Sequence, residues 1–164
     1  MNTFLPGPVL TLATRADAPE ILDLYHSMIG TPGCTWSLLY PEMENIERDM
    51  SHSALWTLRI DGVLAGVVSI GDPGDVGLLG WEPQNPAELA RLAVAHDFQG
   101  QGLAGLLIGH ALETARMAGF DGVILLVSPE NLKAQHLYEK FGFRADGQVF
   151  GWNHPWLKYQ QPFS

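Results

Sequence analysis

The chain has 164 residues, of which 46% are hydrophobic and 16% charged, and its formal net charge is −9. This length and apolar content predict a single domain, residues 1–164, with a sizeable core. The acidic balance argues against nucleic acid as a partner, because phosphate contacts need clustered Lys and Arg, and it suits a cationic acceptor. Cys34 is the single cysteine, which excludes an intrachain disulfide, and no Cys/His cluster has zinc spacing, so no metal is expected.

The longest apolar runs, such as residues 122–127, are far shorter than a membrane span, so no membrane partner is expected. Residues 1–13 lack the basic n-region of a secretory signal peptide. A cytoplasmic protein, by default bacterial, is therefore expected. The oligomeric state stays open, with a homodimer as one alternative.

The first half of the chain predicts two helices and three strands. Residues 9–14 alternate and predict a strand, and Asp17 with Pro19 marks a helix start with an acidic N-cap. That helix ends at Gly30, and a second, acidic helix is predicted over 41–50. Residues 54–60 and 63–70 predict strands, and Asp61-Gly62 between them is the signal of a type I′ hairpin turn.

The second half predicts four more strands and two helices. Residues 72–86 are rich in Gly, Pro and Asp and predict a long turn or an irregular hairpin tip. The further elements are strand 88–95, a helix from Leu103 to near Gly119, central strand 123–127, helix 131–141 with Asn131 as N-cap, and strands 142–148 and 150–159. The predicted order is β-α-α-β-β-β-α-β-α-β-β.

The stretch Gln99-Gly100-Gln101-Gly102-Leu103-Ala104-Gly105 lies between a predicted strand and a predicted helix. Glycine there lets the backbone turn tightly and approach a ligand closely. The first N–H groups of a helix have no intrahelical partner, and the helix dipole adds positive potential. The junction therefore predicts a site for a phosphate or pyrophosphate, although a glycine-rich helix start without a ligand is the alternative.

The same stretch also fits the dinucleotide fingerprint G-x-G-x-x-G, with Glu130 near the position of its ribose-binding acid. In that fingerprint the first glycine follows its strand directly, whereas residues 95–99 intervene here. Only about sixty residues remain after the junction, too few for the rest of a doubly wound domain. A nicotinamide or flavin site is therefore disfavoured.

Residues 131–143 read N-x-x-A-x-x-L-Y-x-x-x-G-F, and residues 99–104 read Q-x-x-G-x-A. Together these two motifs resemble the GCN5-related N-acetyltransferases, over about residues 90–143. The resemblance implies an α/β fold with a mixed, mostly antiparallel central sheet and helices on both faces. It also implies acetyl-CoA-dependent transfer of an acetyl group to a primary amine of a small molecule or peptide. The first ninety residues match the family only in element order, apart from a W-x-x-x-Y-P stretch (residues 36–41) that is similar to one in uncharacterised bacterial members.

The resemblance also assigns cofactor contacts. Its members bind pantetheine and the acetyl oxygen with a strand that splays from its parallel neighbour, bind pyrophosphate with the glycine junction, and place an N-cap asparagine and a tyrosine beside the cofactor. The corresponding positions are Leu92, Ala93, Val94, Gln99, Gly100, Gln101, Gly102, Leu103, Ala104, Gly105, Asn131 and Tyr138.

Catalysis needs a proton donor for the leaving thiolate and a proton acceptor for the attacking amine. Tyr138 matches the family's tyrosine and is expected to act as general acid, since a phenol stays protonated at neutral pH. Glu88, at the mouth of the central strand, is the first choice as general base, followed by Asp72 and Glu82. A solvated strand-end carboxylate is the alternative for Glu88, and Arg91 is expected to be structural or paired with an acid.

The acceptor pocket is expected to be lined by aromatic side chains beside acids, which can hold a cation. Its candidates are Trp36, Tyr40 and Trp81, with Glu42, Glu44 and Trp152 nearby. Direct attack in a ternary complex is expected, because no activated nucleophile is apparent. A non-catalytic module that binds acyl-CoA as a sensor or partner subunit remains the alternative function.

Overall fold

A seven-stranded sheet forms the centre of the molecule, with the strand order β1-β2-β3-β4-β5-β7-β6. The computed structural model describes residues 7–164. The strands are β1 (Val9–Leu12), β2 (Leu55–Ile60), β3 (Val63–Gly71), β4 (Ala87–Val94), β5 (Gly122–Val127), β6 (Arg144–Gly151) and β7 (His154–Pro162). All neighbouring strands pair antiparallel except β4 and β5, which are parallel. The mixed, mostly antiparallel sheet expected from the sequence is confirmed.

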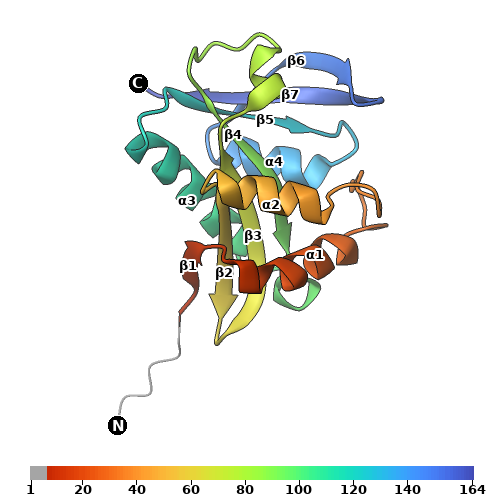
Figure 1. Cartoon of the computed structure of the whole chain (residues 1–164). Coiled ribbons are helices and arrows are strands. Elements are labelled where there is room, and N and C mark those ends of the chain that lie inside the picture. Colours follow the sequence, from red (N-terminus) through yellow and green to blue (C-terminus); the bar gives the residue numbers. More distant parts are fainter. Residues whose placement is uncertain (1–6) are drawn as a thin grey trace.

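Helices cover both faces of this sheet, as the sequence predicts (Figure 1). The α-helices are α1 (Ala18–Ser27), α2 (Met43–Ser51), α3 (Leu103–Met117) and α4 (Leu132–Lys140). Short 3-10 turns are η1 (Arg15–Asp17), η2 (Gly74–Leu78) and η3 (His96–Phe98). One apolar cluster packs α3 and α4 against the sheet around Leu107, Ile108 and Leu125, and a second packs α1 and α2 against it around Ile21, Ile46 and Val67. The element order is the predicted one.

Two local predictions are confirmed by backbone geometry. Asp61 and Gly62, between β2 and β3, have φ of 50° and 77°, the pair of positive values that a type I′ turn requires. Asn131 is the N-cap of α4, and its side-chain oxygen accepts from the Ala134 N–H at 3.2 Å. The residue types at both positions therefore determine the local structure.

One local prediction is corrected, and two others gain detail. The last hairpin turns at Trp152 and Asn153, where φ is 49° and 61°, and not at residue 149. A bulge between Ala145 and Gln148 disturbs the alternation of apolar and polar residues from which the position of the turn was predicted. Asp17 is the N-cap residue of α1 with Pro19 in the first turn, as predicted, but its carboxylate makes no cap bond and instead accepts from the Thr14 N–H at 2.8 Å and pairs with Arg59 at 2.7 Å. Residues 72–86 connect the antiparallel strands β3 and β4 as the predicted irregular hairpin tip, which includes η2.

None of the helices in residues 7–164 is long and apolar enough to cross a membrane. The expectation about a signal peptide in residues 1–13 falls partly on residues 1–6, which lie outside the described part of the chain.

Strands β4 and β5 separate soon after they meet. Their parallel pairing consists of Ala87 with Val123 and Glu88 with Ile124, whereas β4 stays paired with β3 as far as Val94. A bulge between Ala90 and Ala93 adds a residue to β4 opposite β3, and Arg91 within it has φ of 49°. A bulge bends its strand, and this one lies where β4 diverges from β5. The free edge of β4 beyond Glu88 therefore faces an opening in the sheet.

Candidate active site

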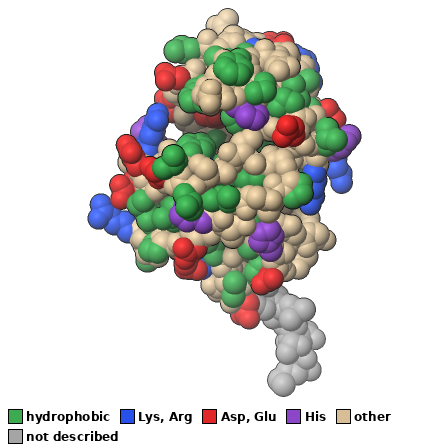
Figure 2. Space-filling model, turned by 90° about the vertical axis from the view of Figure 1, so that its right-hand side faces the viewer, with side chains coloured by type: hydrophobic (Ala, Val, Ile, Leu, Met, Phe, Trp, Pro, Cys, Tyr) green, Lys and Arg blue, Asp and Glu red, His purple; other side chains and the backbone are tan. Residues whose placement is uncertain are grey.

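The opening between β4 and β5 is a cleft of about 220 Å³. Strand β4 contributes one wall, the end of β5 with α4 contributes another, and the loop between α1 and α2 closes a third side. Seen from the right-hand side of Figure 1, the surface is hollowed between its upper and lower parts, with hydrophobic side chains at the edge (Figure 2). The lining residues are Met28, Thr31–Trp36, Leu89–Leu92, Leu126–Ser128, Asn131, Ala134, Tyr138 and Trp156.

The glycine junction leads into α3. Gly100 and Gly102 have φ of 81° and 77°, and nothing lies within 4 Å of a Cβ built at either position. The Leu106 N–H makes the first bond of the helix, to the Gly102 carbonyl at 3.2 Å, so the N–H groups of residues 103–105 are left without an intrahelical partner. Open space and free donors at a helix start fit an anionic group such as a phosphate.

Side-chain hydrogen bonds fix the loop between β4 and α3. The Gln99 amide donates to the Val94 carbonyl at 3.1 Å, and a ring nitrogen of His96 lies 2.9 Å from the Ser27 carbonyl at the end of α1. Gln99 therefore braces the junction against the end of β4. Leu92 lines the cleft, and Ala93 and Val94 pair with β3 on one edge only. The backbone of β4 thus keeps one edge free along the cleft.

Tyr138 is 8% exposed and lines the cleft from α4. Its ring makes edge contacts with Phe143 and Tyr159, at centroid distances of 5.7 and 6.5 Å. Burial raises the pKa of the phenol above its ordinary value, so the hydroxyl keeps its proton. No residue in the described range 7–164 hydrogen-bonds to that hydroxyl, which leaves an O–H donor at the cleft.

Asn131 joins the two sides of the cleft mouth. It caps α4 and lines the cleft, and Gly33 of the α1–α2 loop packs directly against it. A Cβ at Gly33 would lie 2.9 Å from Asn131 atoms, and Gly33 has φ of 79°. A glycine is therefore needed at residue 33 for this loop to approach α4.

Glu88 is the last residue of β4 that pairs with β5, and its side chain is partly buried. Burial raises the pKa of its carboxyl to about 7, with Asp49 adding to the rise and Arg91 and Arg48 opposing it. A carboxyl that titrates near neutral pH is suited to accept a proton from an amine. Glu88 is not a lining residue of the cleft. It lies where β4 and β5 begin to separate.

Arg91 pairs with an acid, as expected from the sequence, and its partner is the buried Asp49 of α2, which the sequence did not identify. Its Nε and Nη2 donate to the two Asp49 oxygens at 2.7 and 2.8 Å, and Nη1 donates to the Tyr40 hydroxyl at 2.9 Å. The Asp49 side chain is 9% exposed. A left-handed φ at a non-glycine residue costs about 1–3 kcal/mol, which this bidentate pair helps to offset. The helical spacing of Ile46, Asp49 and Met50 could have identified Asp49 as a residue facing the sheet.

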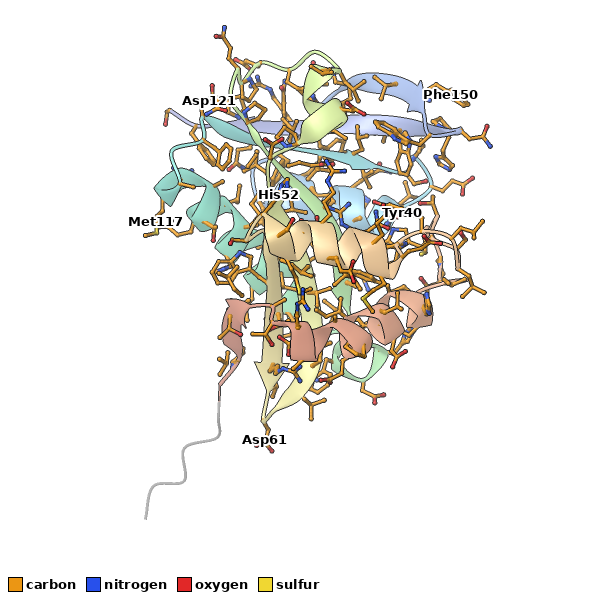
Figure 3. All side chains as sticks on the ribbon, viewed as in Figure 1. Tyr40, His52, Asp61, Met117, Asp121 and Phe150 are labelled. Carbon is orange, nitrogen blue, oxygen red and sulfur yellow. The ribbon has the colours of Figure 1, made fainter. Side chains whose placement is uncertain are left out.

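The three aromatic acceptor candidates lie in different places. Trp36 lines the cleft and packs edge-on against Tyr25, at a centroid distance of 5.2 Å. Tyr40 is outside the lining but contacts Arg91, and it marks the N-terminal end of α2 in Figure 3, with His52 at the other end. Trp81 packs on the Lys158 ammonium at 4.6 Å and donates to the Val76 carbonyl, away from the cleft lining.

The other carboxylates considered as bases have partners of their own. Glu82 pairs with Arg144, and Asp72 accepts from the Gly74 N–H at 2.8 Å. Both side chains are exposed. Across residues 7–164 no group of three or more His, Cys, Asp and Glu side chains could hold a metal ion.

Comparisons with known proteins agree with this geometry. A model of the acetyltransferase (GNAT) family matches residues 21–143. N-acetylaspartate synthetase of Rattus norvegicus is 30% identical over 112 residues, which is 66% of this chain and 35% of that protein. N-acetyltransferase 8B of Homo sapiens is 37% identical over 71 residues, 43% of this chain and 30% of that protein. The chain spans about a third of the length of these relatives.

Solved structures show the same fold. Ribosomal-protein-alanine N-acetyltransferase from Brucella melitensis has a TM-score of 0.76 at 21% identity, covering 94% of this chain and 99% of that one. The Salmonella typhimurium protein yncA, solved with its cofactor acetyl-CoA, has a TM-score of 0.75 at 20% identity, covering 96% and 95%. With three quarters of its length inside the family match, this chain belongs to the acetyltransferase (GNAT) family.

Proposed function

We propose that this protein transfers an acetyl group from acetyl-CoA to a primary amine of a small molecule or peptide. The observation that carries the proposal is the parting of β4 and β5 after two residue pairs, which opens a cleft along the free edge of β4. The chain continues from β4 through η3 to the free N–H groups at the start of α3, which lie outside the cleft lining. Several relatives are named as N-acetyltransferases, and one structural neighbour was solved with acetyl-CoA.

The cleft and the glycine junction that follows β4 fit coenzyme A in three respects. Phosphate oxygens would accept hydrogen bonds from the N–H groups at the start of α3, where Gly100 and Gly102 leave room. The free edge of β4 at Leu92–Val94 would bind the amides of the pantetheine arm, as an added strand would. Asn131 and Tyr138 lie on the opposite wall. When bound, acetyl-CoA supplies an activated acyl thioester.

Proton transfers fall to Glu88 and Tyr138. The amine nitrogen forms a bond to the acyl carbon and the carbon–sulfur bond breaks, so one proton must leave nitrogen and one must reach sulfur. Glu88 accepts the amine proton, directly or through a water, because its pKa of about 7 leaves much of it ionised at neutral pH. Tyr138 donates its O–H toward the sulfur and regains a proton from solvent. The second candidate function, acyl-CoA binding without transfer, is disfavoured by this pair of groups.

Coenzyme A release from acetyl-CoA, measured against amino acids, polyamines, aminoglycosides and peptides, tests the proposal. We expect acceptor-dependent release with at least one class. Tyr138→Phe keeps the ring and removes the proton, so kcat should fall by about a hundredfold while acetyl-CoA affinity changes little. Binding of acetyl-CoA without turnover on any acceptor would favour the non-catalytic alternative, and an unchanged kcat would remove Tyr138 as the acid.

A further inference from the structure

The charged groups at the cleft differ from what the composition of the chain predicts. The protein carries a net charge of −9, yet in the described residues the cleft lining includes no Asp or Glu and one cationic side chain, Arg91. Glu42 and Glu44, expected to attract a cation, are exposed side chains at the start of α2, outside that lining. The lining therefore offers a cationic acceptor no carboxylate with which to pair.

Arg91 retains donor capacity after its internal bonds are counted. Its Nε and Nη2 bind the Asp49 carboxylate, Nη2 also lies 3.5 Å from the Ser69 hydroxyl, and Nη1 donates one N–H to the Tyr40 hydroxyl. A guanidinium has five N–H groups, so one on Nη1 is left. The Tyr40 hydroxyl accepts from Arg91, and no residue in 7–164 accepts its own proton.

A second unused donor lies on α1. Tyr25 is fully buried, and its hydroxyl has no hydrogen-bond partner within the described residues. Burial raises the pKa of this hydroxyl above its ordinary value, and the charges of Arg91 and Asp49 also act on it. A buried hydroxyl without a partner costs free energy, which a ligand or a bridging water would recover. Its ring contacts Trp36 of the cleft lining.

We propose that the acceptor is a small amine with a carboxylate close to its amino group, as in a free amino acid, and that Arg91 and Tyr40 hold that carboxylate. Asp49 neutralises the guanidinium, so the acceptor meets oriented N–H and O–H donors rather than a bare cation. Arg91 lies three residues from Glu88 on β4 and lowers its pKa, which places the carboxylate site near the proton acceptor. The inference rests on the proposed acetyl transfer and specifies its acceptor.

Paired acceptors test the inference with the intact protein. The kcat/KM for L-alanine and L-aspartate is compared with that for L-alaninamide and L-aspartic acid diamide, and with spermidine. The amides have the more acidic ammonium groups and hold more free amine at neutral pH, so a site blind to the carboxylate would favour them. We expect at least one amino acid to exceed its amide by about ten- to a hundredfold, the range of a hydrogen bond to a charged group.

A double variant assigns the preference to Arg91. Arg91→Gln with Asp49→Asn removes both charges together, so that neither is left buried alone, and it removes opposing influences on the pKa of Glu88. We expect it to bind acetyl-CoA and to lose the preference for the acid. Arg59→Gln with Asp17→Asn removes a similar pair at 2.7 Å between η1 and β2, outside the cleft lining, and should retain the preference.

Tyr40→Phe is a milder variant that removes only the tyrosine hydroxyl. We expect it to raise KM for the amino acid and to have a smaller effect on KM for the amide. Amides or spermidine used as well as the acids by the unaltered protein would overturn the inference, as would a preference that survives the double variant. No coenzyme A release with any acceptor would instead count against the proposed function, so the two failures are distinguishable.

Discussion

At the scale of single residues, the proposed proton transfers depend on Glu88 and Tyr138, two groups whose burial changes their pKa values. Glu88 is a strand-end carboxylate in the sequence, and burial makes it a group that titrates near neutral pH. Tyr138 is a helix tyrosine in the sequence, and burial keeps it protonated. Burial disfavours the charged form of each group, so it makes Glu88 a stronger proton acceptor and keeps Tyr138 in the protonated form that can donate.

The pH dependence of turnover follows from Glu88. Only the ionised carboxylate can accept a proton, so log kcat/KM, expressed per concentration of free amine, should rise with pH and level off above an apparent pKa of about 7. Glu88→Gln should slow turnover at neutral pH by about a hundredfold or more and abolish this limb or move it upward. The measurement is kcat/KM across pH with one amine acceptor.

Glu82→Gln is the matched control for Glu88→Gln, because Glu82 is an exposed carboxylate that pairs with Arg144. It should keep the parent profile. If Glu88→Gln keeps the profile and Glu82→Gln or Asp72→Asn alters it, the base has been misassigned, although the cofactor half of the proposal would stand.

At the scale of elements, the start of α3 and the edge of β4 present rows of free backbone hydrogen-bonding groups that no single side chain could supply. Gly102 has left-handed φ and begins a 15-residue helix whose first N–H groups are free. Gly105 is set apart from the other junction glycines: a Cβ there would lie 2.9 Å from the Phe141 ring, so its small size lets α3 approach the end of α4. The junction thus combines the proposed anion site with a packing requirement.

Substitution of Gly102 tests the anion site. Gly102→Glu should abolish the rise in melting temperature that acetyl-CoA causes, because it places bulk and negative charge where phosphate would lie. Gly102→Ala carries the same left-handed strain, of about 1–2 kcal/mol, without the charge, and should keep much of the shift. Gly109→Glu, further along α3 with nothing within 4 Å of its Cβ, should keep it fully; a normal shift in Gly102→Glu would place the phosphates elsewhere.

At the scale of the whole molecule, ligand binding is linked to stability. A ligand at a hundred times its Kd adds about 2.7 kcal/mol to the free energy of unfolding. For a chain of this size the melting temperature should then rise by about 5–11 °C. Acetyl-CoA should give such a shift without an acceptor, and NADH should give none. A shift with NADH alone would restore the dinucleotide interpretation of residues 100–105.

Much of the fold could be predicted because its signals are local. The Asp61-Gly62 turn, the Asn131 cap and the glycines before α3 act through their own backbone preferences. The order of helices and strands followed from periodicity, and two motifs indicated the family. Errors arose where local signals were weak, as in the hairpin that turns at Trp152 and Asn153.

The arrangement of the cleft could not be read in this way. Asp49 and Arg91 are 42 residues apart in sequence, and their pairing depends on α2 packing against β4. The position of β7 between β5 and β6 likewise depends on pairing between strands that are not consecutive in the chain. Trp36 and Trp81 are equal candidates by residue type, yet Trp36 lines the cleft and Trp81 packs on Lys158.

The sequence by itself therefore determined the elements, their order and the family, and it predicted the glycine junction and Tyr138 as site residues. The tertiary structure alone decided where β4 separates from β5 and which carboxyl group has its pKa raised to about 7 by burial. It also decided that, among the described residues, the charged side chain lining the cleft of this acidic chain is an arginine. The physical reason is that backbone preferences act between near neighbours in the chain. Burial and ion pairing depend on which distant segments pack together.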